Sequence, residues 1–204
     1  MLSLTESLVD KLNYHGKTYQ LDLAFDTVLK FYELLDDDNL EDSEKISVAF
    51  EMFMGFTPDD ADFAIAVFQK INQYIAKQPY GDEGEPNVDG NGQAVTPQKY
   101  YSFTQDAEAI YASFREQYGI NLLQERGKLH WDEFKALFAG LGPNTYFQRI
   151  VEIRMRDTSK LEGQALNDTL KSQQYYELNE NKTEKAREQQ FTGFMNTLKA
   201  WAQS

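Results

Sequence analysis

The chain lacks cysteine, so none of its 204 residues can form a disulfide, bind zinc through a thiolate or act as a thiol nucleophile. It also lacks a run of about 18 apolar residues, which a membrane-spanning helix needs. The first residues contain no basic region followed by a long apolar run, so we expect no signal peptide. These absences favour an intracellular protein with no membrane partner.

Positive charge is scarce. Lys and Arg number 20 against 33 Asp and Glu, which gives a formal net charge of −13. A surface this acidic repels phosphate backbones and anionic lipid headgroups unless basic residues gather in one patch. The best set is spread over more than one helical face and is interrupted by acidic residues: Arg149, Arg154, Arg156 and Lys160. We therefore expect no nucleic-acid partner.

Motifs for catalysis are missing as well. The sequence has no Gly-x-Ser-x-Gly elbow, no phosphate loop and no dinucleotide fingerprint. Its two histidines stand apart, and His130 is best interpreted as a packing or capping residue. Asn87–Gly92 matches the start of a calcium loop, but Gln98 occupies the twelfth position, where a bidentate Glu is expected. We predict that the protein is not an enzyme and has no cofactor or metal site.

Apolar residues make up 41% of the chain and aromatic residues 14%, values typical of a globular protein. The pattern predicts a mostly α fold: a bundle-like set of helices, a small N-terminal β-hairpin within 12–23 and a long flexible mid-chain loop. Helical spacing begins at Phe25 and again at Ser43. A third helix is predicted to follow Thr57 as its N-cap, with Pro58 in the first turn.

Glycine and proline cluster in 78–99, which indicates a flexible loop or linker. We therefore divide the chain into 1–77, with the hairpin and three helices, the linker 78–99, an aromatic-rich helical region 100–158, and C-terminal helices in 159–204. Helices are predicted near 104–118, 130–141 and 144–156, the last with Asn144 as N-cap. A further capped start is predicted at Ser159, and a final helix from about Thr183.

The final helix carries a stripe of large apolar side chains at helical spacing: Phe191, Phe194, Met195, Leu198 and Trp201. Two interpretations remain open, because the stripe can pack on the protein's own core or in a partner's groove. A second stripe contains Trp131, Phe134, Leu137 and Phe138, and its spacing is typical of core residues. Sequence does not show whether Tyr111, Phe114 and Trp131 leave part of their surface open as a groove.

Three stretches together resemble one known family. They are the Gly16-Lys17-x-Tyr19 hairpin, the Leu34–Asp38 turn and the motif Leu129-His130-Trp131-x-x-Phe134-x-x-Leu137. Between about 12 and 160 the chain resembles the bacteriophage "gp fifteen" family, which comprises tail proteins of phages and prophages of Gram-positive bacteria. Many members carry a second aromatic residue directly after the tryptophan, where this chain has Asp132.

The resemblance implies a tail assembly chaperone that binds the tape-measure protein, keeps it soluble in the host cytoplasm and is absent from the mature virion. The major tail-tube protein and further copies of the chain are the other partners to consider. We expect contacts through a set of ring-bearing and apolar residues: Tyr111, Phe114, Trp131, Phe134, Phe194, Leu198 and Trp201. The alternative is a structural tail-completion or connector subunit that stays in the virion.

Overall fold

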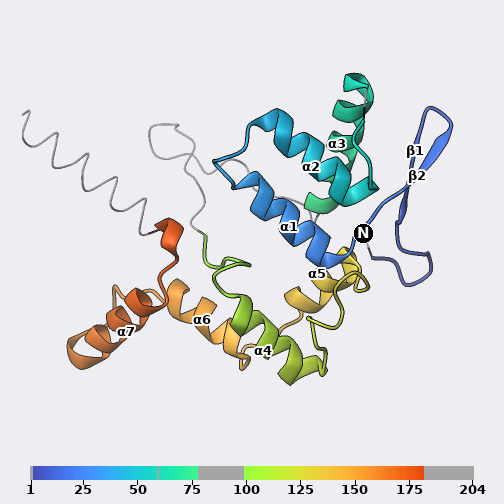
Figure 1. The fold of residues 1–204 in the computed structure, drawn as a ribbon. Helices are drawn as coiled ribbons and strands as arrows, with labels where there is room; N and C mark the ends of the chain where they lie inside the picture. Colours follow the sequence, from blue (N-terminus) through green and yellow to red (C-terminus); the bar gives the residue numbers. More distant parts are fainter. Residues whose placement is uncertain (1, 59, 78–98, 182–204) are drawn as a thin grey trace, which may run out of the picture. The chain divides into compact units, whose positions relative to one another are not determined.

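The computed structural model describes residues 2–58, 60–77 and 99–181 of the protein (Figure 1). The predictions of a mostly helical fold and of an N-terminal β-hairpin are confirmed. The predicted mid-chain loop, the calcium-like turn and the final helix fall outside the described residues, apart from Lys99. Within the described residues, no helix is long and apolar enough to cross a membrane.

The described chain forms two compact units that do not follow sequence order. Unit 1 contains residues 2–77, except for 59, together with 118–141, and unit 2 contains 99–117 and 142–181. The sequence-based division kept 100–158 together, whereas the structure places the Trp131 helix in unit 1. The physical reason is a short backbone bridge: Trp131 N donates to Leu23 O at 2.8 Å, and Phe25 N donates to Leu129 O at 2.9 Å.

Unit 1 begins with an antiparallel hairpin of two strands, β1 and β2, whose connecting turn consists of His15 and Gly16. Both turn residues have positive φ, 46° and 77°, the conformation that a tight two-residue hairpin turn requires. Helices α1, α2, α3 and α5 complete the described part of the unit (Figure 1). The elements are β1 Lys11–Tyr14, β2 Lys17–Gln20, α1 Phe25–Leu35, α2 Asp42–Met54, α3 Ala61–Ala76 and α5 Trp131–Ala139.

Aromatic rings fill the core of unit 1. Phe134 of α5 stacks on Phe25 of α1 with ring centroids 5.0 Å apart, and on Trp131 at 5.6 Å. Phe31 meets the rings of Phe53 and Phe68 edge-on. Offset and edge-on ring pairs add about 0.5–1.5 kcal/mol each beyond their burial, so this network stabilises the α1–α5 contact strongly.

Among the described residues of unit 2, helices α4 and α6 hold the core and helix α7 does not. Phe114 of α4 and Phe147 of α6 are buried, and Ser113 Oγ between them accepts a 2.9 Å hydrogen bond from Phe147 N. This bond satisfies a first-turn N–H of α6 that the helix cannot satisfy itself. The elements are α4 Ala107–Tyr118, whose last residue is assigned to unit 1, α6 Tyr146–Met155 and α7 Gly163–Tyr175.

Three predicted helix starts are wrong by one to three residues. The N-cap of α3 is Asp60, not Thr57, because the Asp60 carboxylate accepts from two backbone N–H groups of the first turn. Helix α6 is capped by Thr145 instead of Asn144, and α7 follows Glu162 instead of Ser159. His130 is the N-cap of α5, as interpreted from the sequence: its Nδ1 accepts from Asp132 N at 3.1 Å.

Candidate functional site

The most developed polar site of the described chain lies in unit 2, around Arg154. This residue occupies the buried face of α6, one turn after Ile150 and two turns after Phe147. Its side chain is only 7% exposed. A guanidinium on an apolar helical face is costly to desolvate unless its donors are matched, so the surrounding oxygens decide whether the site is stable.

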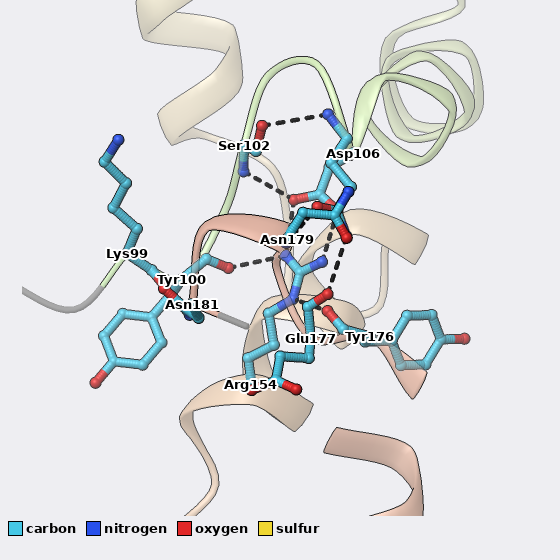
Figure 2. Close-up of polar contacts among 10 residues, drawn as sticks. Lys99, Tyr100, Ser102, Asp106, Arg154, Tyr176, Glu177, Asn179 and Asn181 are labelled. Atoms are coloured by element: carbon cyan, nitrogen blue, oxygen red, sulfur yellow. Dashed lines mark hydrogen bonds and ion pairs between the residues drawn. The ribbon is translucent and has the colours of Figure 1, made fainter. Parts of the chain in front are cut away.

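The guanidinium of Arg154 forms a two-pronged ion pair with Asp106, which precedes α4 (Figure 2). Nη1 donates to Oδ2 at 2.7 Å and Nη2 to Oδ1 at 2.8 Å. Asp106 also accepts from Ser102 N at 3.0 Å. Such paired, parallel bonds are the strongest that a carboxylate forms with a side chain, and they fix its orientation as well as its distance.

Two backbone carbonyls complete the coordination of Arg154. Nε donates to Tyr176 O at 2.6 Å, and Nη1 also donates to Tyr100 O at 2.9 Å. The side chain therefore joins three segments that are distant in sequence: the approach to α4, helix α6 and the residues after α7 (Figure 2). We refer to Arg154, Asp106, Tyr100 and Tyr176 as the Arg154 cluster.

Residues 177–181 are held beside this cluster by amide and ionic contacts. Gln105 Nε2 donates to Glu177 O at 3.0 Å, while Gln105 Oε1 accepts from Asn179 N at 2.9 Å. Leu178, between these two bonds, is 1% exposed. Two contacts with Lys99 follow, an ion pair to Glu180 at 2.8 Å and an Asn181 side-chain bond to its carbonyl at 3.2 Å.

A cavity of about 250 Å³ opens next to the Arg154 cluster. Its walls are mainly polar, and the four described bonds of Arg154 point to protein oxygens. The described residues contain no group of three His, Asp or Glu side chains that could hold a metal ion. The chemistry of this arrangement is thus that of holding chain segments together. The lining residues are Lys99, Tyr100, Arg154, Gln173, Glu177, Leu178 and Asn181.

Unit 1 has a second buried polar group at the start of α5. Asp132 is 3% exposed, and its Oδ2 accepts a 2.5 Å hydrogen bond from the Tyr74 hydroxyl of α3. The Lys135 ammonium lies 3.4 Å from Oδ1 and also donates to Lys77 O at 2.9 Å. Burial and the bond to Asp132 raise the pKa of Tyr74, because both disfavour its phenolate.

Three of the predicted partner-binding rings lie in the cores. Phe114 is 0% exposed, Trp131 3% and Phe134 1%. Tyr111 is partly buried on α4. The structure brings Trp131 and Phe134 into contact in unit 1, while Tyr111 and Phe114 belong to unit 2. Phe194, Leu198 and Trp201 lie outside the described residues, and partner binding by all seven stays a prediction.

Exposed apolar side chains occur on α6 and α7 in unit 2. Tyr175 is 79% exposed, Leu170 46% and Tyr146 40%, and no residue of α7 is buried. A hydrogen bond with the Tyr176 hydroxyl raises the pKa of Tyr146, which places the two phenols side by side. Tyr175 is the last residue of α7 and comes immediately before the segment that the Arg154 cluster holds.

The model of the family described as "Bacteriophage Gp15 protein" matches residues 4–178. The chain belongs to this family. No curated protein and no solved structure matches it. Membership in the Gp15 family indicates a phage structural or tail-related protein. The match contains Asp106 and Arg154 and ends at the buried Leu178.

Sequence reasoning missed the central pair of this Gp15-family chain. Arg154 was grouped with exposed basic residues, although its spacing from Phe147 and Ile150 puts it on the buried stripe of α6. A lone charge on an apolar stripe predicts an ion pair, but not which of many acids is the partner. Asp132 gave no comparable signal, since an acid in a first helical turn is ordinarily solvated. Tyr74 lies on α3, and a partly buried tyrosine hydroxyl usually has a hydrogen-bond partner.

Proposed function

We propose that the protein is a phage tail assembly chaperone that binds the tape-measure protein and keeps it soluble while tail-tube subunits polymerise. The Gp15 family match over residues 4–178 is the observation that carries this proposal. A tape-measure protein is a long helical chain with apolar stripes, and such a chain aggregates when its stripes are exposed. The chaperone acts in the host cytoplasm and leaves before the tail is complete.

The charge distribution of the described chain supports this role. The turn between α1 and α2 carries a run of acids, Asp36, Asp37 and Asp38. Each of the helices α1, α2, α3 and α5 also has an acidic residue in its first turn. With a formal net charge of −13, a complex that covers apolar client stripes remains soluble through mutual repulsion. Repulsion of phosphates also keeps the chain away from the phage genome.

The tape-measure protein contacts side chains that are not buried in the cores of the two units. Phe114, Trp131 and Phe134 are sealed in their units, so a client reaches them only after a rearrangement. Tyr111 is partly accessible, and Tyr146, Leu170 and Tyr175 are exposed on α6 and α7. The apolar stripe beyond residue 181 is the other candidate. Several modest contacts suit a chaperone that must later be displaced, since linked weak sites still hold a client well.

Coexpression with the tape-measure protein tests the proposal. We expect the tape-measure protein to be largely insoluble alone and to become soluble and co-purify when the chain is present. A tape-measure protein whose soluble fraction does not change, with the chain itself expressed and folded, would remove the assignment.

Substitution then locates the client surface. The triple variant Phe194→Ser, Leu198→Ser and Trp201→Ser should lose most of the co-purifying tape-measure protein. A matched control replaces Ile65, Leu123 and Met155 by Ser, since these apolar residues are all more than half exposed, at 56%, 58% and 58%. Circular dichroism confirms that both variants remain folded. If both variants capture equal amounts of client, the C-terminal side chains have no special role.

The rival function is a structural tail-completion or connector subunit retained in the virion. The sealed rings of Phe114, Trp131 and Phe134 favour it, because a permanent subunit needs a closed core more than an open groove. Mass spectrometry of purified particles separates the two functions. A chaperone should be absent from finished tails, whereas a connector should be present at a fixed copy number.

A further inference from the structure

The imidazole of His130 uses both of its ring nitrogens in hydrogen bonds. Nδ1 accepts from the backbone N–H of Asp132 at 3.1 Å, which caps the start of α5. Nε2 lies 3.0 Å from the carbonyl oxygen of Val9. A carbonyl oxygen only accepts and a backbone N–H only donates, so Nε2 carries the hydrogen and Nδ1 carries none. The geometry therefore requires the neutral imidazole in its Nε2–H form.

The His130 ring also connects α5 to the residues that precede the hairpin. Val9, whose carbonyl the ring contacts, is followed by Asp10, and Asp10 O accepts from Leu21 N at 2.7 Å just after β2. The Asp10 carboxylate accepts from Gln20 Nε2 at 3.1 Å. Residues 9 and 10 are therefore held on one side by the end of β2 and on the other by the start of α5.

The backbone at His130 is held independently of its ring. His130 forms an antiparallel bridge with Ala24, beside which Trp131 N donates to Leu23 O at 2.8 Å. Glu133 Oε2 accepts from His130 N at 3.2 Å. These bonds involve main-chain groups of residues 130 and 131, so they persist whatever the protonation state of the imidazole. A change at the ring therefore acts on the cap and on the segment before the hairpin, without unfolding the start of α5.

A proton on Nδ1 of His130 removes the cap. The protonated imidazole carries an N–H at both nitrogens, so Nδ1–H then faces the N–H of Asp132 and cannot accept from it. The ring also places a positive charge at the N-terminus of α5, which is the positive end of the helix dipole. Both effects oppose the arrangement seen in the structure. Histidine ordinarily changes its charge between about pH 5 and 8, which is the range to examine.

The acids around the ring already have partners of their own. Asp10 accepts from Gln20, and this bond lowers the pKa of its carboxyl. Asp132 accepts from the Tyr74 hydroxyl, and Tyr74 also meets the imidazole edge-on with ring centroids 6.5 Å apart. A new ion pair with the imidazolium would disturb these bonds, so loss of the cap decides the outcome. The charged and titratable groups of the elements around the ring are Asp10 before β1, Asp22 beside the bridge, Tyr74 on α3, and Asp132, Glu133 and Lys135 on α5.

We infer that His130 is a pH-sensitive latch, which in its neutral form caps α5 and holds residues 9 and 10, and which releases both when it is protonated. The stabilising contacts are thus complete when the imidazole is neutral and are lost as the pH falls through the range in which it takes up a proton. The inference concerns unit 1 and does not depend on the proposed function, since it requires neither a client nor a second chain.

Hydrogen exchange of the free, full-length protein tests the latch. It is measured at about pH 7.5 and about pH 5.5, within the range in which histidine titrates, and each amide is corrected for its intrinsic exchange rate. In the wild type, protection of the Asp132 amide should fall about fivefold at the lower pH, because the cap is lost. Protection of the Leu21 amide, which donates to Asp10 O, should fall as well.

Two results of this experiment would contradict the latch. Equal or greater protection of the Asp132 amide at the lower pH would overturn the inference as a whole. A loss at Asp132 without a loss at Leu21 would overturn the hold on residues 9 and 10.

Two variants assign the effect to His130. His130→Asn keeps a side-chain oxygen that caps a helix but does not titrate, so its Asp132 amide should be equally protected at both pH values. His15→Asn is the matched control, because His15 is the other histidine of the chain and lies exposed in the hairpin turn, where asparagine accepts its positive φ. This control should lose protection as the wild type does. A loss that persists in His130→Asn, or disappears in His15→Asn, would overturn the assignment to His130.

Nitrogen NMR of the imidazole rings provides a check without any substitution. At about pH 7.5, the spectrum of His130 should show a hydrogen on Nε2 and none on Nδ1, as the two hydrogen bonds require. A hydrogen on Nδ1 at this pH would contradict both bonds and with them the latch.

Discussion

Unit 1 and unit 2 each join segments that are distant in sequence, and the side-chain contacts that stand out in each unit differ in kind. In unit 1, rings join α5 to α1: Phe134 stacks on Phe25, and Trp131 meets Tyr32 edge-on. In unit 2, the approach to α4, helix α6 and the segment after α7 meet at the guanidinium of Arg154. Packed aromatic rings tolerate small shifts in position, whereas a buried two-pronged ion pair such as Arg154–Asp106 does not.

This difference indicates a division of tasks. Unit 1 buries Trp131 and Phe134, which the family motif contains, whereas its exposed apolar residues, such as Ile65 and Leu123, lie apart from that motif in sequence or outside its helix. Unit 2 holds residues 176–179 with polar bonds and leaves Tyr146, Leu170 and Tyr175 exposed. These exposed side chains do not contribute to the buried core of the described part of unit 2, so they are available to a partner.

The largest expected effect comes from Arg154→Ala. Removing one partner leaves Asp106 buried without its counter-charge, which costs about 3–5 kcal/mol in the free energy of unfolding. Arg156→Ala, by contrast, removes an ion pair whose side chains are 49% and 62% exposed, and should cost below about 0.5 kcal/mol. Urea denaturation measures both, and similar losses in the two variants would contradict a special role for Arg154.

A smaller effect is expected from Phe134→Leu, which tests unit 1. The substitution keeps the apolar character but removes the ring that stacks on Phe25 and Trp131, and should cost about 1–3 kcal/mol. The control is Phe56→Leu, because Phe56 is 37% exposed. Thermal and urea unfolding should rank Phe134→Leu well below the control in stability. A reversed rank would mean that the rings do not hold α5.

Tyr74→Phe removes a polar bond from unit 1, whose core consists of aromatic rings, and so tests how far unit 1 depends on polar contacts. The buried Asp132 then loses the hydroxyl donor but keeps Lys135, so we expect a loss of about 1–2 kcal/mol. This is less than for Arg154→Ala because one bond is lost instead of four. A loss as large as that of Arg154→Ala would show that unit 1, too, depends on a polar centre.

The smallest effect is a pH dependence. Because the pKa of Tyr74 is raised in the folded protein, its phenol stays neutral above pH 10 while the unfolded chain ionises. The stabilisation is therefore complete below pH 10 and is lost as the pH rises further. Tyr74→Phe should show a shallower loss of stability between pH 10 and 11. Parallel curves for both proteins would contradict this assignment.

Much of the fold follows from local sequence patterns. The Tyr14–Tyr19 hairpin, the start of α1 at Phe25 and the capping role of His130 were all predicted, since each depends on neighbouring residues. Long-range pairing was not predictable in the same way. Asp106 and Arg154 are 48 residues apart, and nothing local distinguishes Asp106 from other acids.

The candidate site was predicted only in part. Spacing marked Trp131 and Phe134 as apolar-face residues, and it also marked them as typical core, which is where they lie. Spacing alone gives the direction of a side chain from its helix but not the identity of the surface that it meets. The return of 118–141 to unit 1 depends on the Leu23–Trp131 bridge, which is a backbone contact without a side-chain signature.

Comparing the full chain with a chain that ends at Asn181 tests the central claim most directly. Each is coexpressed with the tape-measure protein, and the soluble tape-measure protein is measured per molecule of chain. The account predicts that the full chain solubilises the client and that the shortened chain, although folded, loses most of this capacity. Equal solubilisation by both chains would contradict the claim that the apolar stripe beyond residue 181 binds the client.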